Sequence, residues 1–266
     1  MEFMDNHEKS LKEVWQSVQE SAATIASEEV ALRDFMESIV FSKKSVFESI
    51  SARIVRRLSS LSLSYDTLYN LFMEVFDASL DIRESVIADI VAIKKRDPAC
   101  TEYIMPILYY KGFMAITTYR VSHYLYLNGR KHIAFCLQSL NSEVFAVDIH
   151  PAAKFGKGIL LDHATSFVAG ETSVVSDNVS ILHEVTLGGT GNETGDRHPK
   201  IMSGVLIGAG SKIIGNITVG HCAKVGAGSV VLDDVDDHDT VVGIPAKRVS
   251  KVSESEPAES MNQKFL

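Results

Sequence analysis

Hydrophobic residues return at every sixth position through the second half of the chain. In the first of two runs the repeated position is filled by Ile149, Phe155, Leu161, Phe167, Ser173, Val179 and Val185. In the second run it is filled by Ile201, Ile207, Ile213, Val219, Val225 and Val231. A period of six fits neither an amphipathic helix nor an alternating strand. It is typical of a parallel β-helix, in which stacked coils lie about 4.8 Å apart. With three hexapeptides per coil, Ile149, Phe167 and Val185 would stack into one column of the core.

The two runs are out of phase, because the sixteen residues that separate Val185 from Ile201 are not a multiple of six. The interruption covers residues 188–200, and its glycine and polar content indicates a loop that leaves the wall of the prism. Arg197 and His198 stand side by side in this loop. Since loops on rigid scaffolds often carry function, these two residues are candidates for a site.

The first half of the chain follows a different pattern. Glycine is absent before Gly112, and apolar residues fall at helical spacing. Asp81–Glu84 resembles a capping box that opens a helix running to Lys95, and Asp97 followed by proline would end it. Further helices are expected over 106–126 and 130–140.

These patterns predict an α+β protein in three parts. An α-helical domain would cover residues 1–145, and a β-helix would cover 146–250. The Ser- and Glu-rich segment 251–266 is expected to be a flexible tail.

Composition narrows the class of protein. A net charge of −8 argues against a nucleic-acid-binding protein. Cys100, Cys136 and Cys222 are too widely spaced for a metal-ligand pattern, and their odd number does not fit a disulfide framework. The sequence contains neither an apolar signal core nor a stretch long enough to span a membrane. We therefore expect a cytoplasmic protein.

Candidate chemical residues gather at the start of the prism and in the loop. They are Asp148, His150, Asp162, His163, His183, Arg197 and His198. An aspartate beside a histidine can hold one imidazole tautomer and leave the other nitrogen as a general base near neutral pH. Taken singly, each of these residues is more often a solvated corner residue. A three-histidine metal site, as in the gamma-type carbonic anhydrases, is disfavoured because the spacings of His150, His163 and His183 do not match the coil.

Several longer segments together resemble the serine O-acetyltransferase family. They are Arg96–Ala99, Tyr109–Phe113, Asp148–Ala153, Leu161–Thr165, Val185–Gly191 and Gly195–Lys200. The resemblance implies a left-handed β-helix and transfer of acetyl from acetyl-CoA to L-serine, giving O-acetylserine for cysteine synthesis. It also implies a homotrimer with active sites between neighbouring prisms, or a hexamer that joins two trimers through the helical domains.

The resemblance also implies roles for single residues. His163 would be the general base, Asp148 its orienting carboxylate, and His198 a neighbour of the nucleophile. Asp97 and Asp162 would lie near the serine ammonium group, and Arg197 near its carboxylate.

Acetyl-CoA, as co-substrate, lies along the prism wall in this superfamily. Small residues there permit close approach of the pantetheine arm. The expected contacts are Gly189, Ala209 and Ala227 for the arm, and Lys224, Lys247 and Arg248 for the phosphates. No metal is expected.

Partners follow from the same resemblance. L-cysteine is expected as a feedback inhibitor at the serine site. In many members the tail ends in isoleucine and inserts into the active site of O-acetylserine sulfhydrylase, whereas this chain ends in Leu266, which is also apolar. Two alternatives stay open: an acyltransferase for another acceptor and a non-catalytic scaffold. Asp97, Asp162 and Arg197 disfavour a sugar acceptor, and the intact Asp148, His163, Arg197 and His198 set disfavours a scaffold.

Overall fold

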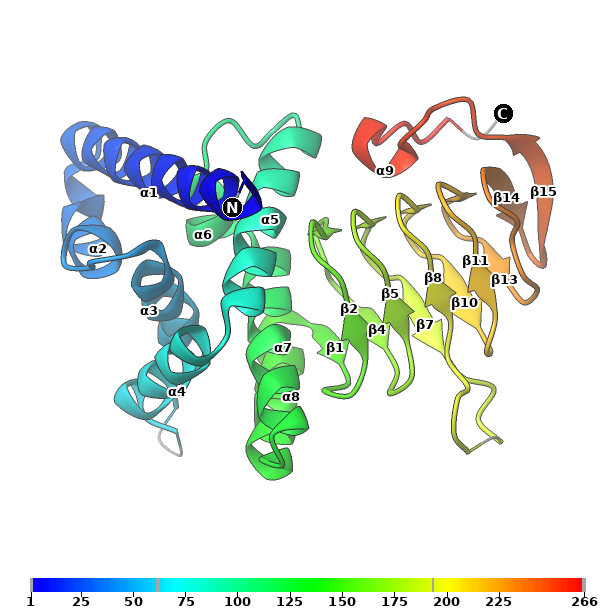
Figure 1. The fold of residues 1–266 in the computed structure, drawn as a ribbon, viewed down its shortest axis with the longest axis horizontal. Coiled ribbons are helices and arrows are strands. Elements are labelled where there is room, and N and C mark those ends of the chain that lie inside the picture. The colour runs from blue at the N-terminus through cyan, green and yellow to red at the C-terminus, as the bar shows by residue number, and fades with distance from the viewer. Residues whose placement is uncertain (1, 61–62, 193, 265–266) are drawn as a thin grey trace.

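A helical domain joined to a prism of short strands makes up the protein in the computed structural model, which describes residues 2–60, 63–192 and 194–264 (Figure 1). The helical domain contains α1 (Glu2–Glu28), α2 (Arg33–Met36), α3 (Val46–Leu58), α4 (Tyr65–Ala78), α5 (Leu80–Arg96), α6 (Ile104–Tyr109), α7 (Lys111–Leu127) and α8 (Lys131–Phe145), with short turns η1 (Val30–Leu32) and η2 (Glu37–Phe41). The predicted fold class, helices followed by a parallel β-helix, is confirmed.

Helix boundaries differ from the expected ones in two places. The first turn of α5 is capped by Ser79, whose hydroxyl accepts a hydrogen bond from the Ile82 N–H, so the predicted capping box at Asp81–Glu84 is wrong. The helix expected over 106–126 is divided at Tyr110 into α6 and α7. Tyr110 has an extended backbone, with a ψ of 105°, which ends α6. At Gly112, in the first turn of α7, a Cβ would lie 2.0 Å from the Leu161 carbonyl oxygen, so glycine allows α7 to pack closely on the prism.

The prism has three walls of parallel strands. The first contains β1 (Val147–Ile149), β4 (Phe167–Ala169), β7 (Thr186–Gly188), β10 (Lys212–Ile214) and β13 (Val230–Val231). The second contains β2 (Lys154–Phe155), β5 (Val174–Val175), β8 (Lys200–Ile201) and β11 (Thr218–Val219). The third contains β3 (Leu160–Leu161), β6 (Ser180–Ile181), β9 (Leu206–Ile207), β12 (Lys224–Val225), β14 (Asp239–Gly243) and β15 (Ala246–Lys251), of which β15 pairs antiparallel.

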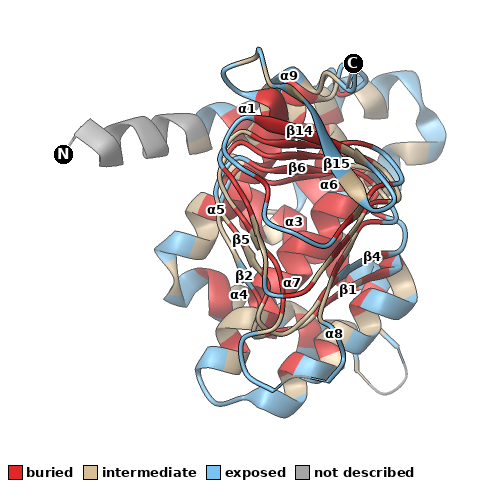
Figure 2. Ribbon diagram, turned by 90° about the vertical axis from the view of Figure 1, so that its right-hand side faces the viewer, coloured by how far each residue is buried: buried red, intermediate tan, exposed pale blue. Residues whose placement is uncertain are grey.

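Most of the six-residue repeat positions are buried on the prism axis, as Figure 2 shows in a view along the prism. In the expected column of Ile149, Phe167 and Val185, Phe167 and Val185 are in register, but Ile149 is not, because Val147 pairs with Phe167 and Ile149 pairs with Ala169. The first coil is thus twenty residues long. The second coil has the regular eighteen residues, because Val168 pairs with Thr186. The two additional residues lie between β3 and β4, within 162–166.

Two buried arginines join the helical domain to the first coil. Arg120 on α7 makes a two-pronged ion pair with Asp89 on α5, and both side chains are almost fully buried. Asp89 also accepts from the Ile159 N–H, and Arg120 donates to the Gly156 carbonyl. Arg96 donates to the Gly158 carbonyl. Removing either member of a buried ion pair strongly destabilises a protein, so these contacts hold α5 and α7 against the prism.

Residues 252–264, expected to be flexible, fold back along the prism toward α5 (Figure 1). The short helix α9 (Pro257–Ser260) buries Ala258, whose carbonyl accepts from Ser180 on β6. Glu259 pairs with Lys95 of α5 at 2.6 Å. These contacts span long sequence separations, so the Ser/Glu-rich composition did not reveal them.

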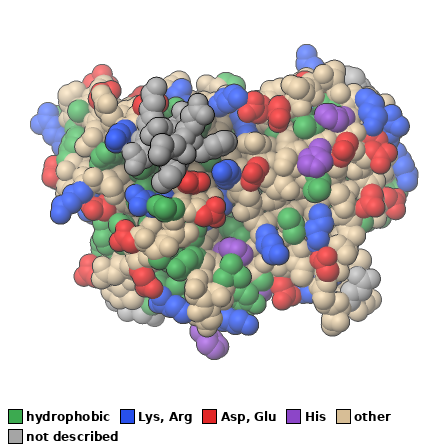
Figure 3. Space-filling view, viewed as in Figure 1, with side chains coloured by type: hydrophobic (Ala, Val, Ile, Leu, Met, Phe, Trp, Pro, Cys, Tyr) green, Lys and Arg blue, Asp and Glu red, His purple; other side chains and the backbone are tan. Residues whose placement is uncertain are grey.

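Charged side chains of both signs are intermingled on the face drawn in Figure 3. Among the described helices, none is long and apolar enough to cross a membrane.

Candidate active site

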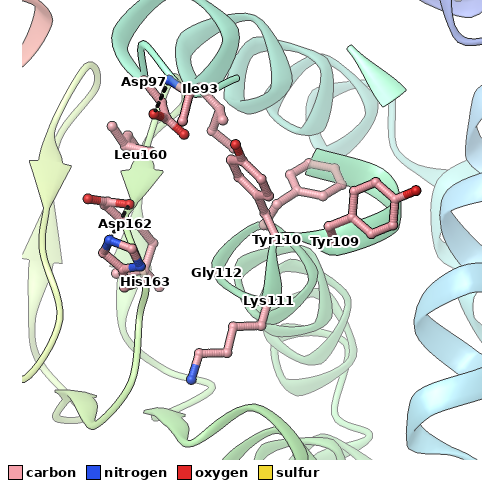
Figure 4. A pocket seen from close by; sticks show the side chains of 12 residues that line it. Ile93, Asp97, Tyr109, Tyr110, Lys111, Gly112, Leu160, Asp162 and His163 are labelled. Atoms are coloured by element: carbon pink, nitrogen blue, oxygen red, sulfur yellow. Dashed lines mark hydrogen bonds and ion pairs between the residues drawn. The ribbon is translucent and has the colours of Figure 1, made fainter. Parts of the chain in front are cut away.

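A cavity of about 340 Å³ lies where α5, α6 and α7 meet the first coil of the prism (Figure 4). Asp97, Asp162 and His163 line it together, with Tyr110 and Lys111 on the helical side. Sequence reasoning named the first three separately, and the structure brings them into one cavity. We refer to Asp97, Asp162 and His163 as the acidic half-site.

The enlarged corner of the first coil presents His163. His163, Ala164 and Ser166 all have positive φ, which is uncommon for residues other than glycine and costs about 1–3 kcal/mol each. The corner is held in place because the Ser166 N–H donates to the Ala146 carbonyl at 2.8 Å and the Thr165 carbonyl accepts from the Glu184 N–H at 2.7 Å. The His163 side chain consequently stands 74% exposed on a fixed backbone.

Two carboxylates share the cavity with His163. Burial raises the pKa of Asp162, the nearby His163 opposes this, and the like charge of Asp97 adds to the increase. The Asp162 Oδ1 atom lies 3.8 Å from His163 Nε2. Asp97, at the end of α5, accepts a hydrogen bond from the Ala99 N–H. The pKa of the Tyr110 hydroxyl is raised, mainly because the group is buried and also because it is hydrogen-bonded to Asp97. Two acidic groups in one cavity favour a bound cation such as an ammonium group.

Arg197 is fixed to the prism by contacts on its backbone and side chain. The Thr172 hydroxyl accepts from the Arg197 N–H at 3.0 Å. The guanidinium group donates to Glu171 Oε2 at 2.8 Å and to the Gly195 carbonyl at 3.0 Å. The hydrogen bond from Arg197 in turn lowers the pKa of Glu171.

His198 is held through its Nδ1 atom. The Thr172 N–H donates to this nitrogen at 3.2 Å, which favours the tautomer that carries its proton on Nε2. Burial lowers the pKa of His198, and neighbouring Arg197 lowers it further. The ring is closely confined, because a Cβ on Gly170 would lie 1.9 Å from Nε2 and one on Gly189 would lie 3.4 Å away.

Asp148 lies apart from His163. Its Oδ1 atom accepts a hydrogen bond from Gln138 Nε2 of α8 at 2.7 Å, and it borders a different cavity of about 450 Å³. No hydrogen bond or ion pair between Asp148 and His163 is recorded in the described ranges. The electrostatic neighbours of His150 include Glu171, Asp148 and Arg197, which places Asp148 on the side of the loop. We call Asp148, Glu171, Arg197 and His198 the basic half-site.

Arg197 and His198 do not line the cavity of the acidic half-site. One chain therefore presents two separate groups of the expected site residues. Asp97 ends α5, whereas Arg197 and His198 lie in the loop between β7 and β8.

The expected CoA contacts are also distributed. Gly189 adjoins His198, while Ala209 and Ala227 occupy neighbouring coils at one corner, where the Gly228 N–H donates to the Ala209 carbonyl. Lys247 is exposed on β15, and with Arg248 it borders a cavity of about 270 Å³. Lys224 is only 3% exposed and pairs with Glu254 of the tail at 3.0 Å, so the tail covers it.

Several residues of the site had no signal of their own in the sequence. Thr172, Gly170 and Gln138 act through contacts with His198 and Asp148 that lie ten to twenty-eight residues away. In the portion of the chain that is described, no group of three or more His, Cys, Asp or Glu side chains is arranged to hold a metal ion.

Two family models match the chain. One is described as serine acetyltransferase, N-terminal, over residues 14–118, and the other as bacterial transferase hexapeptide (six repeats) over residues 198–233. Serine acetyltransferase of Haemophilus influenzae is 45% identical over 254 residues, which are 96% of this chain and 95% of the relative. Serine acetyltransferase 4 of Arabidopsis thaliana is 46% identical over 259 residues, which are 97% of this chain and 73% of the relative.

Solved structures agree with these matches. A serine acetyltransferase in complex with cysteine has a TM-score of 0.93 and 45% identity, covering 96% of this chain and 99% of that one. The Brucella abortus enzyme in complex with coenzyme A has a TM-score of 0.89 and 47% identity, covering 90% and 96%. The soybean enzyme complexed with serine has a TM-score of 0.89 and 49% identity, covering 90% and 99%.

Proposed function

The chain belongs to the serine acetyltransferase family, and from this premise we propose how its own residues carry out the reaction. It transfers acetyl from acetyl-CoA to the hydroxyl group of L-serine and so forms O-acetylserine and CoA for cysteine biosynthesis. The observation that carries the residue assignment is the presentation of His163 at the enlarged corner, beside Asp97 and Asp162.

His163 is the general base. A hydroxyl group is a weak nucleophile until a base removes its proton, and imidazole is suited to this near neutral pH. The freed serine oxygen forms a bond to the thioester carbonyl carbon, giving a tetrahedral intermediate. The carbon–sulfur bond then breaks, and the protonated His163 returns its proton to the departing CoA sulfur. Atoms and charge balance without a further reactant.

Charge complementarity orients the substrate. Asp97 and Asp162 hold the serine ammonium group, and Arg197 holds the carboxylate. His198 supplies its Nε2–H beside the reacting oxygen, a role supported by the acceptor state of its Nδ1 atom. Arg197 must turn from Glu171 toward the substrate or hold both, since the guanidinium group has five donors.

Two neighbouring chains build each site. The acidic half-site of one chain meets the basic half-site of the next, which brings Asp148 onto His163 as its orienting carboxylate. The separation of the two half-sites on one chain and the 74% exposure of His163 support this arrangement. The assembly is a trimer, and pairing of trimers through the helical domains makes a hexamer.

Acetyl-CoA lies along the prism wall. Gly189, Ala209 and Ala227 adjoin its pantetheine arm, and Lys247 with Arg248 faces its phosphates. Lys224 takes part only when the tail releases it from Glu254. The enzyme needs no metal for this reaction.

L-cysteine carries the same ammonium and carboxylate groups as serine, so it competes for Asp97, Asp162 and Arg197 as a feedback inhibitor. The complex of a related enzyme with cysteine supports this. We place the enzyme in the cytoplasm. Its tail could dock into O-acetylserine sulfhydrylase through Leu266, but this residue lies outside the described residues.

The assignment is tested by measuring CoA release from acetyl-CoA with L-serine, L-homoserine or a simple sugar as acceptor. Release is expected with L-serine and not with the sugar, because only an amino acid meets both half-sites. L-homoserine should react poorly, since its hydroxyl lies one methylene further from the groups that hold the amino acid. Faster release with another acceptor would favour a different acyltransferase, and no release from a folded assembly would favour a scaffold.

A further inference from the structure

Asp148 is held by one neutral donor. Its side chain points outward from β1, where the flanking Val147 and Ile149 point into the prism core. Gln138 Nε2 donates to Oδ1 at 2.7 Å, and the structure records no hydrogen bond for Oδ2 in the described ranges. One carboxylate oxygen is therefore engaged and the other is free to accept.

Gln138 lies on a helix that is packed firmly against the core and β1. Its neighbour Leu137 is fully buried and anchors α8 on the core. One turn further along, Asn141 Nδ2 donates to the Val147 carbonyl at 3.2 Å, which ties the helix to β1. Phe145 ends α8 and is also buried, and only the left-handed residue Ala146 separates it from the strand. The helix and the strand thus move as one unit, so the amide of Gln138 stays in register with Asp148.

We infer that Gln138 is a positioning residue of the reaction: its amide fixes the rotamer of Asp148 and aims the second carboxylate oxygen at the imidazole of His163. This inference rests on the proposed role of Asp148. A neutral amide suits the task, because a lysine or arginine at this place would neutralise the charge that stabilises the imidazolium. Loss of a hydrogen-bond partner that orients a functional carboxylate or imidazole typically lowers activity by about 10- to 100-fold.

Other charged groups face Asp148 without replacing Gln138. Glu143 borders the same cavity from α8, and His150 follows on the chain after β1. Neither has a recorded hydrogen bond to Asp148 in the part of the chain that is described. Gln138 is therefore the group that determines the direction of its carboxylate.

The test compares Gln138→Leu and Gln138→Glu with wild type in the assembled enzyme, by steady-state kinetics from pH 6 to 9. Leucine keeps the volume and helix propensity of the site but cannot donate. We expect Gln138→Leu to lower kcat about tenfold and to leave KM for serine and for acetyl-CoA within about twofold. In Gln138→Glu the introduced carboxyl can donate only when protonated, so its rate relative to Gln138→Leu should rise as the pH falls. A purely structural effect would not produce this pH dependence.

Ser142→Ala is the matched control, because Ser142 lines the same cavity one turn along α8 and its hydroxyl has no recorded hydrogen bond there. Asp148→Asn and the double variant with Gln138→Leu complete a cycle, and the double variant should be no slower than Asp148→Asn alone. Mass measurement of each variant verifies the assembly.

The outcomes distinguish the role of Gln138 from the role of Asp148. If Asp148→Asn lowers kcat strongly but Gln138→Leu stays within twofold of wild type, the inference about Gln138 is overturned and the proposed function stands. Additive losses in the double variant would also overturn it. If Asp148→Asn itself is without effect, the role of Asp148 in the proposed function fails first.

Discussion

At the scale of single residues, the backbone determines what each side chain can do. His163 is presented by a corner with three non-glycine residues at positive φ, whereas His198 is confined between Gly170 and Gly189. The His163 imidazole is exposed, and the buried His198 imidazole accepts a hydrogen bond at Nδ1. These different settings fit the different roles that we propose for the two histidines.

Substitution of the base should abolish most of the turnover. We expect His163→Ala to lower kcat by about 10²- to 10⁴-fold, the usual effect of losing a positioned general base. His183→Gln is the matched control, because its ring lies 5.8 Å from that of His163 and it also replaces an imidazole near Asp162. Equal losses in both variants, or near-normal turnover of folded His163→Ala, would remove His163 from the mechanism.

The motifs named candidate chemical residues, but not the residues that hold these candidates in place. Thr172 and Gln138 have no local signature, because threonine and glutamine are ordinary in a corner or a helix. Their importance arises from hydrogen bonds to His198 and Asp148 across the fold. Such contacts depend on coil register, which the six-residue period did not determine correctly for the first coil.

At the scale of elements, deviations from the regular repeat mark the functional places. The corner after β3 gains two residues and presents the base, while the loop after β7 carries Arg197 and His198. The break between α6 and α7 at Tyr110 serves the same cavity, because it lets Gly112 approach Leu161. The period predicted the walls of the prism, and its interruption predicted the loop, but the enlarged corner lay hidden in an unbroken hydrophobic series.

The ion pair between Glu254 of the tail and Lys224 of β12 should stabilise the fold in a pH-dependent way. Burial opposes ionisation of Glu254, but hydrogen bonds from Lys224, its own backbone N–H and Asn262 lower its pKa from 4.5 to about 2. A pKa lowered in the folded state contributes stability above pH 4.5, and this contribution is lost as the pH falls toward 2. We expect Glu254→Gln to lower the thermal midpoint by about 5 °C at pH 7, because buried Lys224 loses its charged partner.

The difference between Glu254→Gln and wild type should shrink as the pH is lowered from 5 to 3, as followed by thermal unfolding. Glu29→Gln is the control, since Glu29 is exposed and has no recorded ion pair in the described chain. A difference that is constant with pH would show that Glu254 acts by packing rather than by charge.

At the scale of the whole molecule, the proposed function makes activity a property of the assembly, because the half-sites are separate on one chain. A single chain holds an acidic cavity at the helical domain and a basic group at the loop. In the proposed reaction each group binds one end of the amino acid, so neither would suffice alone. Motif order alone does not record where subunits meet, and the expectation of a shared site came from the family resemblance.

The central claim, that the base and the basic half-site come from different chains, is tested most directly by subunit complementation. His163→Ala and Arg197→Ala are co-expressed in equal amounts, and CoA release is assayed at low serine concentration. Each variant alone should be nearly inactive, and the mixture should regain about a quarter of wild-type activity per chain, since random mixing in a trimer restores about one site in four. Asp148→Asn with Arg197→Ala is the control pair, because both lie in the basic half-site and should not complement. Activity of the first mixture no higher than the sum of its parents would contradict the claim.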